Sequence, residues 1–362
     1  MQILRSYRDP LILLLVWAIA TLIVYLPFLT SPLKLQLIYQ NWDGPNYVVI
    51  GKSLYNPQII KEFNFLGGWM TPIMFASNFP LYAIFIKILS FIGYFRAMLG
   101  ISLLFSILSI WLFYHFIKKF KLTTQPLFLS LVFIFLPPRW FSVYHTGNSD
   151  PQFVFFTLLT LYFFYADKLL LSGISGGLAQ LSRFQGIVYF PIFIFLLFKK
   201  KYMGQFLRKS LNYLIIPVSL LLVFLLYLYQ YGDFFAFFHS RPTVGLLKWP
   251  PFAVFNWRAP WVGTIWLEEI IFLFIIEMVA IANLFRMGNK YRPLAYFSLF
   301  CFIPSLFVVQ QDISRYSLWL APATLIGLKD IIERKEFKLI LLVIIPAVIA
   351  YSTNFFQLNL AP

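Results

Sequence analysis

Long apolar runs alternate with short polar connections along the whole chain. Runs that reach or approach the length needed to cross roughly 30 Å of hydrocarbon lie at about 10–29, 97–117, 124–138, 151–166, 211–230, 264–285, 293–309, 313–329 and 337–353. The stretch 171–198 is interrupted by several glycines and by Arg183, so it predicts two shorter helices that meet near Arg183. The pattern therefore predicts an all-α polytopic membrane protein, with residues 1–362 forming a single integral membrane domain.

Residues 1–29 begin like a signal peptide, with Arg5 and Arg8 ahead of an apolar run. The run is long enough to span a membrane and lacks the small-residue pattern of a cleavage site. We therefore expect an uncleaved first span.

The placement of the apolar run 80–95 decides the predicted topology. If it crosses the membrane, the cluster Lys118–Lys121 falls outside, whereas an interfacial helix leaves every strong basic cluster inside. These clusters are Arg5/Arg8, Lys118–Lys121, Lys199–Lys201 with Arg208/Lys209, Arg286/Lys290/Arg292 and Lys329/Arg334/Lys335/Lys338. The positive-inside rule selects the second arrangement: about eleven crossings, a cytoplasmic N-terminus and long external loops at 30–96, 139–150 and 231–263.

Composition agrees with lipid as the main solvent of the chain. Hydrophobic residues make up 60% of the sequence and charged residues only 12%, against roughly 25% charged in soluble domains. The net charge of +16 is concentrated in short clusters between apolar runs, which is typical of loops beside a membrane and argues against nucleic-acid binding. A single cysteine, Cys301, excludes a disulfide framework or a Cys-based metal site within one chain.

Acidic residues are scarce, so each external one is informative. Asp43 follows Trp42 and precedes Gly44-Pro45-Asn46-Tyr47, where the segment from Pro45 to Tyr55 predicts a short surface helix. Asp43 could simply cap that helix. Alternatively, it is a carboxylate fixed at the outer rim, able to act as a general base or a metal ligand, with Trp42 anchoring it at headgroup level.

A second external carboxylate, Asp150, ends the polar segment Tyr144–Asp150 ahead of the span at 151. It too could be only a helix cap, because proline follows it. His145, Asn148 and Asp150 nevertheless place polar side chains on the same predicted face as Asp43.

Two arginines stand close to membrane depth. Arg183 lies between apolar helices with Gln185 nearby, and Arg315, followed by Tyr316, lies one turn into a span. An ionisable group at this depth is a candidate functional residue, and a guanidinium suits a phosphate or carboxylate partner. For Arg183, a structural ion pair with Asp150 or Asp43 is the alternative.

The loop 231–263 combines charged residues with several tryptophans. These could stack on sugar rings or headgroups, although an interfacial aromatic belt is the simpler interpretation. Its members are Asp233, His239, Arg241, Lys248, Arg258, Trp249, Trp257, Trp261 and Trp266. The separation of His145 and His239 matches no metal-ligand spacing.

The order of these motifs resembles the C-type (GT-C) superfamily of membrane glycosyltransferases, and within it the family of the second GPI mannosyltransferase and its prokaryotic relatives. Trp42-Asp43 to Tyr47 is similar to the family's first-loop segment. The later matches are Phe79-Pro80-Leu81-Tyr82, Leu136-Pro137 to Asp150, Leu181 to Gly186, and Ser314-Arg315-Tyr316. Two positions depart from the family: Asp150 does not align with its usual Glu, and Asn46 and Tyr47 replace its frequent His.

The resemblance implies a bundle of spans with juxtamembrane helices in a long first external loop. It also implies a polyprenyl-phosphate sugar donor, typically carrying mannose, and a lipid, glycan or protein acceptor. Asp43 would be the catalytic base; Trp42, Tyr47, His145, Asn148, Asp150, Arg183, Gln185, Arg315 and Tyr316 would bind substrate. Asp43 and Asp150 could chelate Mg²⁺ or Mn²⁺ only if their loops meet. A lipid-linked saccharide flippase or transporter and a non-catalytic scaffold subunit remain the alternatives.

Overall fold

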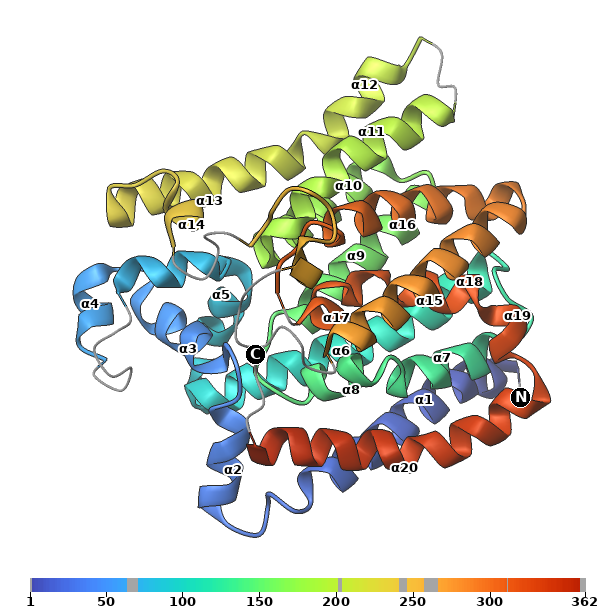
Figure 1. Ribbon diagram of the computed structural model, residues 1–362, viewed down its shortest axis with the longest axis horizontal. Coiled ribbons are helices and arrows are strands. Elements are labelled where there is room, and N and C mark those ends of the chain that lie inside the picture. Colours follow the sequence, from blue (N-terminus) through green and yellow to red (C-terminus); the bar gives the residue numbers. More distant parts are fainter. Residues whose placement is uncertain are drawn as a thin grey trace.

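A computed structural model describes residues 2–63, 71–200, 204–240, 246–256, 266–310 and 312–358. Within these ranges the regular structure is helical, apart from one isolated bridge between Leu247 and Val308 (Figure 1). The longest helices are α1 (Gln2–Tyr25), α6 (Tyr94–Lys119), α13 (Ile215–Tyr231), α15 (Trp266–Arg286) and α20 (Lys335–Leu358). The all-α fold predicted from the apolar pattern is confirmed for these residues.

Shorter helices complete the bundle and its two ends. The apolar ones are α7 (Pro126–Phe135), α9 (Asp150–Tyr165), α10 (Leu169–Ser182), α11 (Tyr189–Lys199), α16 (Arg292–Ser305) and α18 (Ala321–Gly327). The remaining short α-helices are α2 (Pro32–Tyr39), α3 (Gly44–Ser53), α4 (Pro57–Lys61), α5 (Pro80–Ile88), α8 (Pro138–Tyr144), α12 (Phe206–Ser210), α14 (Ala236–His239), α17 (Ile313–Tyr316) and α19 (Lys329–Ile332).

Within the described ranges, four helical stretches are long and apolar enough to cross a membrane: Arg8–Tyr25, Tyr94–Lys119, Phe206–Tyr231 and Lys335–Gln357. The pair α7 and α8 passes the same test together but is bent by 69°. These helices support an integral membrane protein. The predicted eleven crossings also require the shorter helices to span, and that number stays a prediction.

Two predicted spans are not single helices. The run 124–138 ends at the bend between α7 and α8, because the Pro137-Pro138 pair supplies no backbone donors there. The run 313–329 divides into α17, the 3₁₀ turn η8 (Leu318–Leu320) and α18, which begins beside Pro322. Apolar composition alone did not reveal either break.

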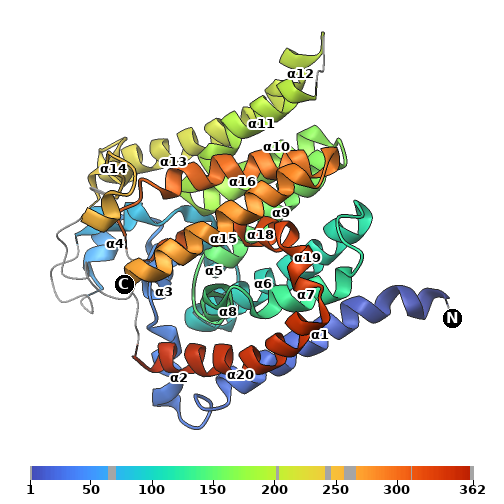
Figure 2. The same cartoon turned by 45° about the vertical axis from the view of Figure 1, so that its right-hand side comes forward.

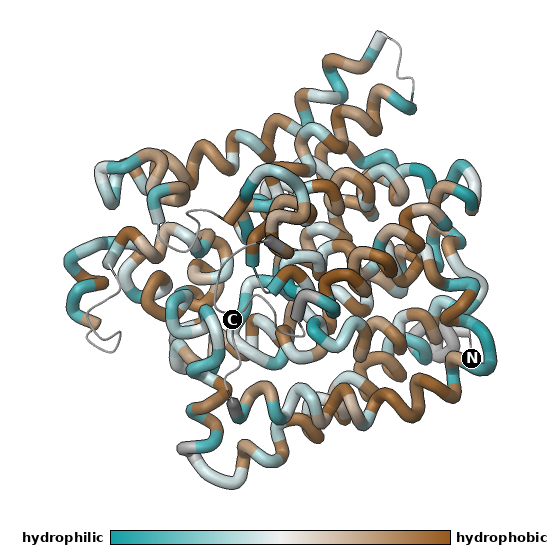
Figure 3. The backbone as a smooth tube through the Cα atoms, viewed as in Figure 1, coloured by the Kyte–Doolittle hydropathy of each residue, from teal (hydrophilic) through white to brown (hydrophobic). Residues whose placement is uncertain are grey.

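The basic clusters gather at one end of the bundle. Figures 1 and 2 place the N-terminus, α12 and α19 toward one end and α3, α4 and α14 toward the other. Lys329 Nζ donates to the Leu122 carbonyl at 3.0 Å and Lys338 Nζ to Gln125 Oε1 at 2.8 Å. Clusters far apart in sequence therefore share an end, and Figure 3 shows hydrophobic residues along most of the helices between the ends.

Residues 80–95 do not form a spanning helix. Helix α5 ends at Ile88, a 3₁₀ turn covers Ser90–Ile92, and α6 starts separately at Tyr94. Nine residues rise only about 13 Å, less than half of a roughly 30 Å hydrocarbon layer. Helix α5 packs against α3, α6 and α10, as expected of a juxtamembrane helix in the first external loop.

The predicted break at Arg183 is confirmed. Helix α10 ends at Ser182, Arg183 is extended, and the 3₁₀ turn η4 (Phe184–Val188) leads into α11. At Gly186, an added Cβ would lie 2.6 Å from the backbone of Gln180, so the turn folds back on α10 more closely than a larger residue permits.

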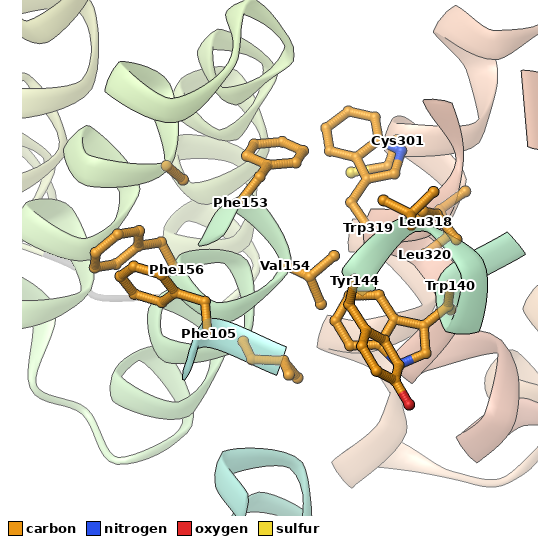
Figure 4. Packing of buried hydrophobic residues seen from close by; sticks show 14 of the residues in the cluster. Phe105, Trp140, Tyr144, Phe153, Val154, Phe156, Cys301, Leu318, Trp319 and Leu320 are labelled. Carbon is orange, nitrogen blue, oxygen red and sulfur yellow. The ribbon is translucent and has the colours of Figure 1, made fainter. Parts of the chain in front are cut away.

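Aromatic side chains fill much of the core behind this break. Figure 4 shows Phe153 facing Trp319 and Trp140 beside Tyr144. The ring centroids of Phe153 and Trp319 are 5.6 Å apart, and those of Trp140 and Tyr144 are 5.3 Å apart. This packing joins α9, α8 and η8, and so fixes the polar segments that lie next to them.

Candidate active site

A cavity of about 230 Å³ lies among the start of α3, η4 and the segment around α17. Its polar lining includes five of the predicted site residues: Asp43, Tyr47, Arg183, Gln185 and Tyr316. Apolar side chains make up most of the remaining lining, among them Phe79, Phe184, Phe237, Val308 and Trp319. The cavity thus combines a charged part with an apolar wall.

Asp43 is held by a distant side chain rather than used as a helix cap. It precedes α3 but makes no side-chain capping bond. Instead, Arg315 Nη2 donates to Asp43 Oδ2 at 2.7 Å, and 37% of the Asp43 side chain remains exposed. Trp42, just before it, adopts a left-handed conformation with φ of 51°. A bulky residue in that region is strained, which fits a functionally constrained turn.

Arg315 joins the two segments, predicted to be external, that carry the predicted carboxylates. Its side chain is 8% exposed, and its Nε donates to Asp150 Oδ2 at 3.0 Å. Its Nη2 also donates to Asn148 Oδ1 at 3.0 Å. The predicted meeting of Asp43, Asn148 and Asp150 is therefore present, and a guanidinium brings it about.

Arg183 pairs with Asp150, as the structural alternative proposed, and also lines the cavity. Its Nε donates to Gln185 Oε1 at 3.3 Å, and its guanidinium lies 5.6 Å from the ring centre of Tyr316. Asp150 is almost fully buried between Arg183 and Arg315. Asp150 and Asn148 therefore position the arginines, while Arg183 faces the cavity.

Sequence reasoning missed a third pair, Arg139 with Asp312. Arg139 bonds to Asp312, and Asp312 Oδ2 lies 3.7 Å from Arg315 Nη1. The ring of Trp42 lies below both arginines, 5.1 Å from the Arg139 guanidinium and 5.5 Å from that of Arg315. The sequence feature that could have revealed this pair is the position of Arg139, a charged residue between Pro138 and Trp140. Three aspartates and three arginines form one network whose formal charges balance.

Burial alters the acid–base properties of two groups beside the cavity. Desolvation raises the pKa of Tyr47, opposed by the nearby Arg183 charge. The Tyr47 hydroxyl shares a hydrogen bond with Ser149 Oγ at 2.7 Å, so Tyr47 stays neutral and can only donate or accept hydrogen bonds. Desolvation likewise raises the pKa of Asp312, with Arg139 and Arg315 acting in the opposite direction.

His145 lies apart from the other predicted site residues. It is fully buried, its Nδ1 lies 2.7 Å from the Phe141 carbonyl, and its Nε2 lies 3.1 Å from Thr21 Oγ1. Tyr25 donates to its carbonyl at 2.6 Å. His145 therefore ties α8 to α1, and we do not retain it among the substrate contacts.

The carboxylates do not fit a divalent cation in this arrangement. Both Asp43 and Asp150 bind the Arg315 guanidinium, so a positive charge already occupies the position between them. Among the described residues, no group of three or more His, Cys, Asp or Glu side chains could hold a metal ion.

Part of the aromatic-rich loop borders the same cavity. Phe237, Leu246 and Leu247 line it, and Lys248 N donates to the Phe307 carbonyl at 2.9 Å. His239 pairs with Asp233 at 2.7 Å and is 60% exposed. Of the residues predicted for this loop, Arg241, Trp257, Arg258 and Trp261 lie outside the described residues, as does the side chain of Trp266.

Comparison with known proteins supports the family resemblance. Residues 77–229 match the family model of dolichyl-phosphate-mannose-protein mannosyltransferases. The matched segment includes Asp150 and Arg183 but neither Asp43 nor Arg315. No curated protein matches the chain.

One solved structure shows the same fold over nearly the whole chain. It is the Archaeoglobus fulgidus oligosaccharyltransferase tethered with an acceptor peptide, with a TM-score of 0.54 and 14% sequence identity. The alignment covers 98% of this chain and 55% of that one, so this chain spans about half its length. At this identity the likeness concerns the fold. In its motif order, matched family segment and fold, the chain resembles the membrane glycosyltransferases of the C-type superfamily, as its sequence motifs predicted.

Proposed function

We propose that this protein is a glycosyltransferase that moves a sugar from a polyprenyl-phosphate donor to an acceptor hydroxyl, with inversion at the anomeric carbon. Mannose is the sugar that the resemblance and the name of the matched family suggest. The main support is that Asp43, a partly exposed carboxylate, and Arg183 line one cavity that also has an apolar wall.

The cavity suits both parts of such a donor. Arg183 uses Nη1 and Nε in its contacts with Asp150 and Gln185, and a guanidinium has five N–H donors, so it can also bind a phosphate. The rings of Phe184 and Phe237 stack in the apolar wall with centroids 4.4 Å apart. An isoprenoid chain can pack against this surface while its phosphate stays beside Arg183.

Asp43 is the proposed general base. The acceptor O–H proton passes to Asp43 as the acceptor oxygen forms a bond to the anomeric carbon. The bond from that carbon to the phosphate oxygen breaks at the same time, and polyprenyl phosphate leaves. Arg183 stabilises the negative charge that develops on the leaving phosphate. Attack from the face opposite the leaving group inverts the configuration.

We further propose that the site faces the outside of a cell membrane and that the N-terminus is cytoplasmic. This follows from the positive-inside rule, because the basic clusters that end α6 and begin α20 share one end of the bundle. Asp43 precedes α3, at the other end (Figure 1).

A lipid-linked saccharide flippase is the second candidate, because discontinuous helices such as α7/α8 and α10/α11 are common in transporters. Radiolabelled polyprenyl-phosphate mannose in liposomes with the purified protein and a cell-lipid extract separates the candidates. A labelled product supports the transferase. Labelled donor that only changes leaflet supports the flippase. If neither a labelled product nor a change of leaflet is observed, the scaffold subunit is the remaining candidate.

A further inference from the structure

A second, larger cavity of about 780 Å³ lies on the other side of α17. Its walls come from α8, α15, α18, α19 and α20, and most of its lining is apolar, for example Phe272, Ile276, Leu325, Ile332, Phe337 and Val348. We infer that this cavity holds the hydrocarbon chain of the acceptor, and that the acceptor is a membrane lipid with an uncharged, hydroxyl-bearing headgroup. This inference rests on the proposed transferase function.

The cavity is bordered by α20, one of the helices that are long and apolar enough to cross a membrane. Ala347 and Ile344 line it and are themselves exposed on the surface of this helix. A lipid chain can therefore enter from the side, without leaving the hydrocarbon layer. The mostly apolar lining favours a hydrocarbon chain over a polar ligand.

The polar residues of the cavity disfavour an anionic headgroup. Arg139 lines it, but its charge is already neutralised by Asp312. The other ionisable residues in the lining are Glu269 and Glu277, both acidic. A phosphate here would meet carboxylates without a free cation, in contrast to the first cavity with Arg183. The two cavities are therefore suited to different headgroups.

Glu277 provides a specific partner for a hydroxyl. Its side chain is 3% exposed, lies in the wall of this cavity, and has an Oε2 atom without a hydrogen-bond partner among the described residues. A buried polar atom normally has a partner, so the open Oε2 position in a membrane segment points to a ligand. A lipid hydroxyl entering the cavity would satisfy it.

Helix α17 connects this cavity to the proposed site. Ser314 and Ser317 line the second cavity, Tyr316 lines the first, and Arg315 holds Asp43. A headgroup bound at the Ser314 end therefore lies across one short helix from the proposed base. Because Asp43 lines the first cavity and not the second, the acceptor hydroxyl would leave Glu277 and pass the Ser314 end of α17 to reach the proposed base.

Photolabelling tests this inference without relying on transfer. Purified protein in nanodiscs is irradiated with diacylglycerol that bears a diazirine in one acyl chain, and the labelled peptides are identified by mass spectrometry. We expect labels on α15 and α18 residues of the cavity. Ala347→Trp should reduce them about tenfold, the factor expected when roughly two methylene groups lose their contacts. Ala350→Trp is the matched control, because Ala350 is an exposed alanine of the same helix outside the cavity lining.

A second variant tests the headgroup partner. Glu277→Leu should lower labelling about fivefold, as expected for the loss of one hydrogen bond between uncharged groups, and Glu277→Gln should retain most of it. Glu268→Gln, on the exposed face of the same helix, should change nothing. Monodisperse gel filtration of each variant confirms that it folds.

Three results would overturn the inference. The first is labelling that is spread over the lipid-facing surface and is unaffected by Ala347→Trp and Glu277→Leu. The second is stronger labelling of this cavity by a diazirine-bearing polyprenyl phosphate than by diacylglycerol. The third is transfer by wild-type protein that shows no label in the cavity, which leaves the proposed function intact. Cavity labelling without any transfer by wild type would contradict the proposed function, and would leave a lipid-binding cavity that is not an acceptor site.

Discussion

Arg315 Nη2 donates a hydrogen bond to Asp43 Oδ2 at 2.7 Å and so joins two residues that are 272 positions apart in the sequence. The same guanidinium binds Asp150, which ends the segment Tyr144–Asp150. Three separate parts of the chain therefore meet at one buried side chain. Arg315 orients the proposed base and leaves part of its carboxylate open to the cavity.

Removing Arg315 should destabilise the fold. Arg315→Ala leaves Asp150 buried with only Arg183 as its charged partner and breaks the link to Asp43. Breaking a buried ion pair typically costs about 3–5 kcal/mol. We expect a clearly lower melting temperature in detergent micelles. Arg96→Ala, which removes an exposed arginine at the start of α6, should leave it unchanged. Equal melting temperatures for Arg315→Ala and Arg96→Ala would show that Arg315 has no structural role.

His145 should make the protein sensitive to mild acid. Burial lowers its pKa from 6.5 to about 3, so the folded state keeps it neutral where the unfolded state takes up a proton. Its contribution to stability is therefore full above pH 6.5 and is lost progressively as the pH falls toward 3. The slope is about 1.4 kcal/mol per pH unit.

The melting temperature between pH 6.5 and 5 measures this effect. In His145→Gln the melting temperature should depend less on pH. In His239→Gln, which changes an exposed histidine, it should depend on pH as in the wild type. The proposed linkage is wrong if His145→Gln and wild type lose stability in parallel.

The turn at Gly186 should tolerate no side chain. In Gly186→Ala, the new Cβ would lie 2.6 Å from the backbone of Gln180 and force η4 away from α10. Because Arg183 begins that turn, we expect a higher KM for the polyprenyl-phosphate donor and a lower melting temperature. Gly100→Ala is the matched control, since nothing lies within 4 Å of its added Cβ. An unchanged KM in Gly186→Ala would show that the turn does not contribute to donor binding.

Transfer should not depend on a divalent cation bound between Asp43 and Asp150. The Arg315 guanidinium already contacts both carboxylates. Excess EDTA should therefore leave the rate of sugar transfer unchanged. A loss of activity that Mg²⁺ or Mn²⁺ restores would mean that Arg315 leaves this position in the working enzyme.

Much of the fold could be predicted from local pattern. The break at Arg183 was visible because glycines and a charge interrupt an apolar run, and the separate helix α5 followed from the positions of basic clusters. The breaks in 124–138 and 313–329 were missed. Local signals were present, Pro137-Pro138 in the first run and Ser314 to Ser317 in the second, but each lies inside a run whose overall composition is apolar.

The residues of the candidate site could be predicted from the sequence, but the ion pairs between them could not. Asp43, Asp150, Arg183 and Arg315 stood out because charges are rare in this sequence, and the structure brings them together. Which carboxylate pairs with which arginine depends on long-range packing. Arg139 was overlooked because it is the first residue of the predicted external loop 139–150, where a charge is ordinary. The burial of His145 likewise depends on α1, which is remote in sequence.

The most direct test of the account is the turnover of Asp43→Asn with radiolabelled polyprenyl-phosphate mannose. Asparagine keeps the size of the side chain and can still contact Arg315, but it cannot accept the acceptor proton. We predict normal expression and donor binding with transfer reduced about 10²–10⁴-fold, the usual effect of removing a positioned base. Glu62→Gln, an exposed acid just after α4, should transfer at the wild-type rate. Near-normal turnover by Asp43→Asn would contradict the assignment of Asp43 as the base.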